Sequence, residues 1–138
     1  MDVQTYRDLR VWQAGMELTV GIYALTKTLP ESEVHGLSGE LQRAATAIPA
    51  NIADGHARGH LRDYLKFLAV ARSSLAEVAT YLELVERLDY ASPQRIAPLH
   101  ELAASLDRQL MALRDSLAIR LQEDPFLYES DHPMDPSP

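Results

Sequence analysis

The stretch "AIPANIADGHARGHLRDYLKF" (residues 47–67) is the most informative about the fold, because one helical segment ends within it and another begins. Pro49 stands inside an apolar helical pattern, where its missing N–H and its ring predict a kink. Gly55 and Gly59 then predict a helix stop and a short corner. The chain is therefore expected to turn back on itself between two long helices.

Helical periodicity extends on both sides of this corner. The preceding helix is expected to begin near Ser38 as its N-cap, and the following helix to cover about residues 60–89. A helix over residues 5–28 carries apolar residues at alternating four- and three-residue spacing, and another opens after Ser92-Pro93 and continues to Leu121. The start of this last helix could also lie a few residues further on, because Pro98 would break a hydrogen bond in a helix that already ran from Pro93.

Long helices joined by short loops pack most economically side by side in alternating directions. We therefore predict an all-α fold, an antiparallel up-and-down four-helix bundle over residues 1–121.

The first and third helices have more apolar surface than one neighbour can cover. A second stripe on the first helix contains Leu9, Trp12, Met16, Val20 and Tyr23. The third helix adds apolar residues beside its main leucine stripe: Phe67, Val70, Val78, Tyr81, Val85 and Leu88. The pattern alone leaves two alternatives open, since both stripes could be consumed inside one bundle or be covered by copies of the same chain.

Charge and composition separate a body from a tail. The chain has 138 residues, no cysteine and a formal charge of -7, of which residues after Leu121 carry five acids and no Lys or Arg. Residues 122–138 are predicted to be an acidic, proline-rich, disordered tail, in which Phe126, Leu127 and Tyr128 could dock on the body or a partner. No signal peptide or membrane-spanning run is expected, which favours a cytoplasmic location.

Motifs for catalysis or cofactor binding are not apparent. His56 and His60 have the i, i+4 spacing of a zinc-binding helix, but Ala57 replaces the catalytic glutamate of that motif and Gly59 interrupts the helix. The glycines near residues 36–39 and 54–55 match no phosphate-binding loop, and no serine nucleophile motif is present. We predict no enzyme activity, no metal, no cofactor and no small-molecule substrate.

Cations follow the corner at helical spacing. Arg58, Arg62 and Lys66 form a ridge at successive i+4 positions, and Arg43 and Arg72 could lie near it. Such a ridge could contact the phosphates of a nucleic acid, whereas its alternative role is a solvated face that pairs with nearby aspartates.

Three segments resemble a known family. They are "DLRVWQAGMEL" (8–18), "LTKTLPESEVHGLSGELQRAATAIPANIADG" (25–55) followed by Arg58, and "FLAVARSSLAEVATYLELVERLDY" (67–90). Over about residues 6–120 the chain resembles the four-helix-bundle proteins encoded in intervening sequences of bacterial 23S rRNA genes. The resemblance implies an up-and-down bundle that assembles as a ring of five subunits, in a family with no established enzymatic activity. The chain is also similar to the accessory variability proteins of diversity-generating retroelements, which bind a reverse transcriptase and nucleic acid through basic surfaces.

The family element N-I-A-[DE]-G-x-x-R contributes Asn51, Asp54, Gly55 and Arg58. We hypothesise that these residues shape the corner, with Asn51 and Asp54 bonding local backbone or Arg58, near a subunit contact. The predicted function is a homo-oligomeric scaffold for RNA, DNA or a protein partner. The alternatives are a sequence-independent nucleic-acid binder acting with a reverse transcriptase-type partner, and a metal protein using His56 and His60.

Overall fold

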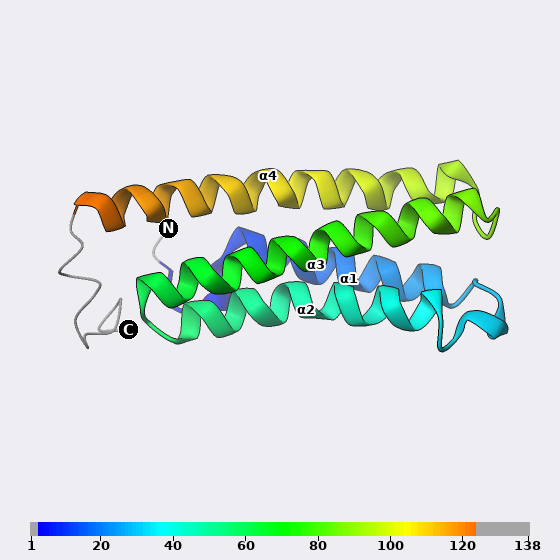
Figure 1. Cartoon of the computed structure of the whole chain (residues 1–138), viewed down its shortest axis with the longest axis horizontal. Coiled ribbons are helices and arrows are strands. Elements are labelled where there is room, and N and C mark those ends of the chain that lie inside the picture. Colours follow the sequence, from blue (N-terminus) through cyan, green and yellow to red (C-terminus); the bar gives the residue numbers. More distant parts are fainter. Residues whose placement is uncertain (1–2, 124–138) are drawn as a thin grey trace.

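The computed structural model describes residues 3–123, and within them the fold is all-α. Four long helices run up and down in alternating directions (Figure 1). Their bounds are Arg10–Thr26 (α1), Leu37–Ala57 (α2), Leu61–Arg87 (α3) and Pro93–Glu123 (α4). Two 3-10 turns accompany them, Tyr6–Asp8 (η1) and Glu31–Glu33 (η2). The predicted all-α, up-and-down arrangement of four helices is confirmed.

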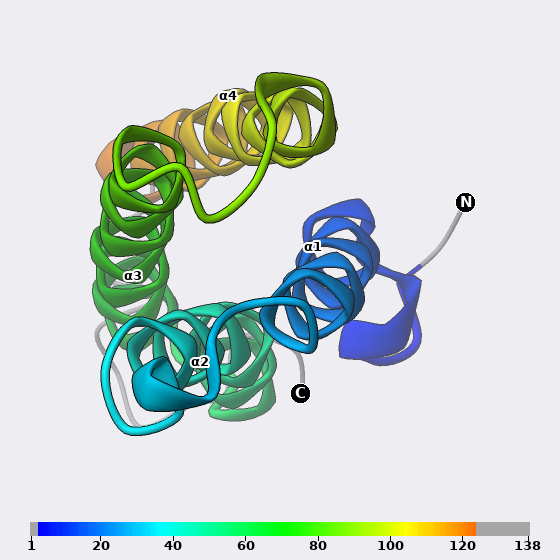
Figure 2. The ribbon, with the colours of Figure 1, turned by 90° about the vertical axis from the view of Figure 1, so that its right-hand side faces the viewer.

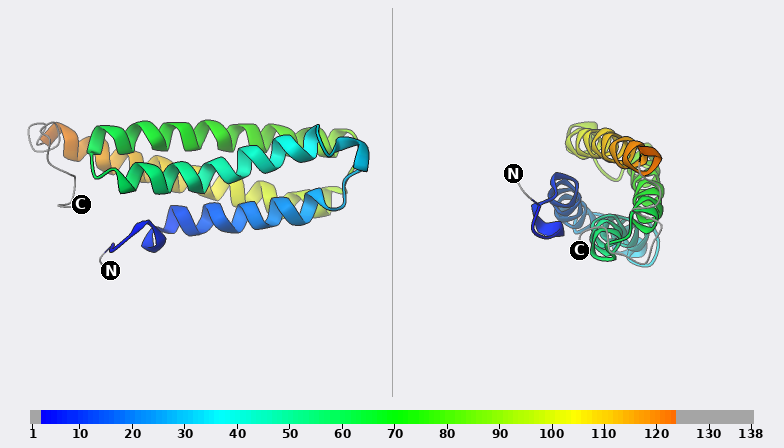
Figure 3. Two further views of the ribbon diagram at one scale, coloured as in Figure 1. Left: turned by 90° about the horizontal axis from the view of Figure 1, so that it is seen from below. Right: turned by 90° about the vertical axis from the view of Figure 1, so that its left-hand side faces the viewer.

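Each helix packs against its neighbours in chain order, and α4 returns to α1. The α2–α3 contact is the most extensive and the α1–α4 contact is the sparsest. Viewed end-on, the four helices form a curve whose two ends, α1 and α4, lie apart (Figure 2). The α2–α3 corner, the start of α1 and the end of α4 lie at one end of the molecule, and the other two loops lie at the opposite end (Figure 3).

One apolar core runs along the inside of this curve. Every helix contributes side chains that are essentially inaccessible to water, and each such leucine or isoleucine adds roughly 1.5–3 kcal/mol to the burial free energy. The largest of these are Leu18, Ile22, Leu25, Leu41, Ile48, Ile52, Leu61, Leu68, Leu82, Ile96, Leu106 and Leu110. The predicted leucine stripes therefore face inward.

Helix α1 packs against α2 at Pro49. Helix α2 continues through this proline, which has no N–H to offer the carbonyl of Ala45. The hydroxyl of Thr19 on α1 lies 3.1 Å from that carbonyl oxygen and 2.7 Å from the Gly15 carbonyl oxygen of its own helix, so its one proton can be donated to either. A Cβ on Gly15 would lie only 3.4 Å from Ile48 and 3.5 Å from Pro49, so a small residue here lets α1 come close. The neighbouring helix thus supplies a donor that α2 itself lacks.

Helix α2 begins near Ser38, as predicted, but Ser38 is not its N-cap. The helix begins at Leu37, and Ser38 is buried inside its first turn instead of capping it. The side chain of Glu33 accepts a hydrogen bond from the Leu37 N–H at 3.0 Å. The same carboxylate accepts a hydrogen bond from the Tyr90 hydroxyl at 2.8 Å, which ties the α1–α2 loop to the α3–α4 loop. A carboxylate outside the helix therefore serves as the cap.

The first and last helices also differ from the expected bounds. Residues 5–9 form a separate capped turn, because the Asp8 carboxylate accepts hydrogen bonds from the Gln4 and Thr5 N–H groups and Leu9 is extended. Helix α4 starts directly at Pro93 and contains Pro98, which is exposed, so water can bond the carbonyl that Pro98 leaves unpaired.

Helix α4 also ends at Glu123, two residues beyond the boundary predicted between body and tail. The rest of the predicted tail, with Phe126, Leu127 and Tyr128, lies outside the described residues.

The surplus apolar residues have different fates on the two helices. On α1, Leu9 and Trp12 pack against the core, whereas Met16, Val20 and Tyr23 are 39%, 67% and 41% exposed, so this part of the stripe is uncovered in the single chain. On α3, Val78 and Val85 are buried in the core, whereas Val70 and Leu88 are exposed. The apolar excess of α3 is thus largely used inside the bundle, and that of α1 is not.

Candidate functional site

The corner after α2 depends on one residue with a left-handed backbone. Arg58 caps the helix, and Gly59 follows with φ of 66°. The Gly59 N–H donates to the His56 carbonyl at 3.2 Å, and His60 is extended before α3 begins. A side chain is disfavoured at such a φ, so glycine is the natural residue for this turn.

Gly55 has a different role from the one the sequence predicts. It does not stop α2, which continues to Ala57. A Cβ on Gly55 would lie 2.7 Å from the Cβ of Phe67 and 3.3 Å from Cδ1 of Tyr64, both on α3. Gly55 is therefore the point where α2 and α3 come too close for any side chain.

The polar members of the family element form local contacts at this corner. The Asn51 side-chain amide donates to the Ala47 carbonyl at 2.7 Å. Asp54 Oδ1 lies 3.5 Å from Arg58 Nε, and both side chains are about half exposed. The Arg58 guanidinium also lies 4.7 Å from the centre of the Phe67 ring, within cation–π range. Arg58 thus links the end of α2 to α3, and a role for these residues at a subunit contact stays a prediction.

The two histidines do not share a helix face. The His56 ring packs edge-on against Tyr64, with ring centres 5.6 Å apart, whereas His60 precedes α3. Tyr64 is 2% exposed, and burial raises the pKa of its hydroxyl to about 12. Within residues 3–123, no group of three or more His, Asp or Glu side chains could hold a metal ion. The arrangement therefore does not support the metal alternative.

The structure brings together three of the four cations proposed for partner contact. Arg58, Arg62 and Lys66 are exposed at the corner. Arg43 lies 15 residues before Arg58 on α2, about 22 Å away along the helix axis. It pairs with Glu40 of its own helix instead.

Arg72 is not part of this ridge either. Its Nε donates to Asp107 of α4 at 2.9 Å, and this hydrogen bond raises the pKa of the guanidinium. The pair joins α3 to α4 across the outside of the bundle. Because both side chains are a third or more exposed, we expect it to add little to stability.

Charge is distributed unevenly between the two ends of the bundle. We divide each helix at its middle and call the half with the α2–α3 corner the basic half (residues 3–17, 48–74 and 108–123). It contains nine Lys or Arg residues and six acids, whereas the acidic half (18–47 and 75–107) contains four cations and nine acids. Sequence reasoning missed this polarity, because the near-neutral total hides it until the fold sorts the residues by end.

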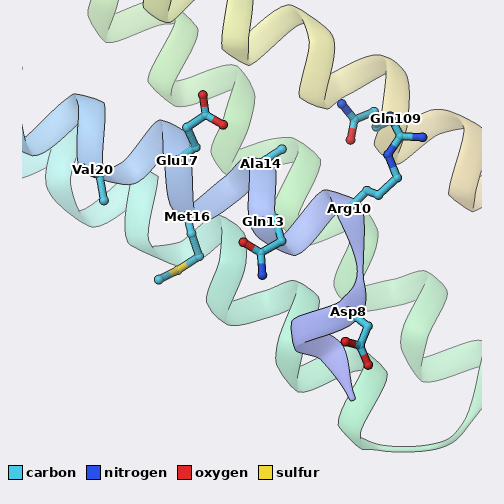
Figure 4. Close-up of a pocket in the computed structure, with 8 residues that line it drawn as sticks. All are labelled: Asp8, Arg10, Gln13, Ala14, Met16, Glu17, Val20 and Gln109. Carbon is cyan, nitrogen blue, oxygen red and sulfur yellow. The ribbon is translucent and has the colours of Figure 1, made fainter. Parts of the chain in front are cut away.

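A groove between α1 and α4 lies in the basic half (Figure 4). Arg10, Gln13 and Glu17 line it from α1, and Gln109 from α4. The Gln109 side-chain oxygen is buried without a hydrogen-bond partner. At the groove's end, backbone N–H groups of Gln4 and Thr5 hold the pKa of Asp8 below its ordinary value. No sequence motif marks this groove, which exists because α1 and α4 pack so sparsely.

These features define a class: an up-and-down protein of four helices with a basic corner, an exposed apolar face on α1 and, in the described helices, no segment able to span a membrane. The model of the family described as 23S rRNA-intervening sequence protein matches residues 7–112. The chain belongs to this family.

A solved structure has the same fold. It is the crystal structure of a protein of unknown function from the S23 ribosomal protein family of Bacteroides thetaiotaomicron. The match has a TM-score of 0.71 and 24% identity, and it covers 75% of this chain and 97% of the other. No curated protein matches the sequence. The comparisons therefore support the family and the fold.

Proposed function

We propose that this protein is a non-enzymatic scaffold that assembles with copies of itself. The observation that carries the proposal is the uncovered face of α1 formed by Met16, Val20 and Tyr23. Large apolar side chains that recur on one helix face are typical of an interface, because contact with a second surface removes them from water. A ring of five subunits is the assembly that the family resemblance implies. Closing such a ring requires the α1 face to meet a different surface of the next copy.

Sedimentation velocity on wild-type protein and on Val20→Glu tests this assembly. We expect an oligomer for the wild type and a shift toward monomer for the variant, because the new carboxylate would be buried in the contact. Val34→Glu is the matched control, since Val34 is 56% exposed and lies outside the α1 face. A wild-type chain that sediments as a monomer at all concentrations would rule out the scaffold.

The charge polarity favours a second role, in which the basic half contacts nucleic-acid phosphates. The exposed ridge of Arg58, Arg62 and Lys66 supports it, as does the excess of cations in that half. Such contacts would be sequence-independent, because phosphates carry no base information. A reverse transcriptase-type partner, implied by the resemblance to accessory variability proteins, would then meet the protein on the same nucleic acid.

Fluorescence anisotropy with a labelled single-stranded RNA of random sequence tests this role. We expect the affinity to fall steeply with salt and to weaken in Arg62→Gln/Lys66→Gln. Lys27→Gln/Arg87→Gln removes the same charge from the acidic half and should have a smaller effect. Equal losses in the two double variants would show that net charge, and not the ridge, governs binding.

A further inference from the structure

The acidic tail begins at the basic half of the bundle. Helix α4 ends at Glu123, at the same end of the molecule as the α2–α3 corner (Figure 1). After Glu123 the sequence has four more acids, Asp124, Glu129, Asp131 and Asp135, and no Lys or Arg. The fold therefore attaches the most acidic segment of the chain to the half that has an excess of cations.

The spacing of the acids in the sequence limits which cations they can meet. Asp135, the last of them, follows Glu123 by 12 residues, and a random coil of that length has an end-to-end distance of about 20 Å. The acidic half of α4 is reached 16 residues before the end of the helix, about 24 Å away along its axis. The exposed cations Arg108, Arg114 and Arg120 lie within this distance on α4, before the acidic half is reached.

Charge favours the same location. The acidic half carries nine acids against four cations and would repel the tail, whereas the basic half has the opposite excess. A short tether holds the tail at a local concentration in the millimolar range, and because each exposed ion pair is weak on its own, the contact depends on several acids engaging together. Salt would weaken these contacts, because the cations concerned are exposed.

We infer that the C-terminal tail is an intramolecular polyanion that occupies the cations of the basic half and competes there with nucleic acid. The competition rests on the proposed nucleic-acid contact, whereas the tail–body contact does not. The protein would then bind RNA only where the nucleic acid outcompetes its own tail. Anything that displaces or neutralises the tail would increase binding.

The first experiment measures RNA affinity in a full-length variant with a neutral tail, Asp124→Asn/Glu129→Gln/Asp131→Asn/Asp135→Asn. We expect affinity to rise by about three- to tenfold at about 50 mM salt, and the gain to shrink at about 200 mM. The control neutralises four acids of the acidic half, Glu31→Gln/Glu77→Gln/Glu86→Gln/Glu101→Gln, which changes the net charge equally. Equal gains in the two variants, or no gain with the neutral tail, would overturn the competition.

The second experiment detects the tail–body contact without nucleic acid. The chain has no cysteine, so Ser130→Cys takes a single spin label in the tail. We expect the label to broaden the amide signals of residues 58–66 more strongly than in the neutral-tail variant carrying the same label. The tether alone contributes equally to both proteins, so this difference isolates the charge contact.

The two experiments separate the ways in which the inference can fail. Equal broadening in the charged and neutral tails would overturn the tail–body contact itself. If neither the wild-type protein nor the neutral-tail variant bound RNA at any salt concentration while the broadening differed, the nucleic-acid role and the competition would both be wrong. The intramolecular contact would then stand alone.

Discussion

Two helical glycines illustrate how much a single missing side chain can decide. Gly15 and Gly55 both lie inside helices, where glycine costs about 1 kcal/mol relative to alanine. At Gly15 a Cβ would make ordinary contacts with Ile48 and Pro49, but at Gly55 it would overlap Phe67. The same substitution should therefore have opposite effects at the two positions.

We expect Gly55→Ala to lower the free energy of unfolding by about 1–3 kcal/mol, because α2 and α3 must move apart. Gly15→Ala, the matched control, should raise it by about 0.5–1 kcal/mol through helix propensity. Chemical denaturation of the two variants measures both values. A Gly55→Ala protein as stable as the wild type would contradict the tight α2–α3 contact.

At the scale of the elements, a few polar side chains complete helices that cannot complete themselves. Thr19 on α1 offers a donor to the α2 carbonyl that Pro49 leaves free. Glu33 caps α2 and binds Tyr90 near the end of α3. These bonds link elements that are distant in the sequence. Losing one of them should therefore destabilise both of the elements that it joins.

Glu33 makes the stability of the loop end depend on pH. Hydrogen bonds from the Leu37 N–H and the Tyr90 hydroxyl hold the pKa of Glu33 below its ordinary value. A lowered folded pKa means that the stabilisation is complete above the unfolded pKa and is lost as the pH falls through the folded pKa. We expect wild-type stability to decline in that acidic range, and the decline to be smaller in Glu33→Gln.

Urea denaturation over a pH series measures this dependence for both proteins. Glu31→Gln provides the control, because Glu31 lies in the same turn and is exposed. Identical pH profiles for wild type and Glu33→Gln would mean that the carboxylate contributes nothing as an ion.

For the whole molecule, the uneven packing of the four helices predicts uneven local stability. Helices α2 and α3 have the most extensive mutual contact, whereas α1 and α4 meet only sparsely and lie at the open ends of the curve (Figure 2). Regions with fewer tertiary contacts open more readily to solvent. We therefore expect α2 and α3 to be the most stable part of the bundle, and α1 and α4 to open more readily.

Hydrogen exchange should follow this order, with the slowest amides in α2 and α3 and faster exchange in α1 and α4. Mass spectrometry of peptides from each helix measures it. Comparing wild type with Val20→Glu shows how much protection of α1 comes from assembly. If α1 in that variant still exchanged as slowly as α3, the ranking by packing would be incorrect.

The four helices, their leucine stripes and the α2–α3 corner could all be predicted from the sequence, because helical periodicity and the placement of proline and glycine are local signals. The sequence also pointed to the apolar excess of α1, since that stripe is visible as a spacing. Contacts between residues far apart in the sequence could not be predicted in this way, because they depend on how the helices pack. Gly55 packs against Phe67, Arg43 lies far from Arg58, and Glu33 caps α2 in place of Ser38.

The charge polarity also belongs to the tertiary structure. Antiparallel packing places the first half of one helix beside the second half of the next. Charges interleaved along the chain are thereby sorted into a basic end and an acidic end, which no summation along the sequence reveals.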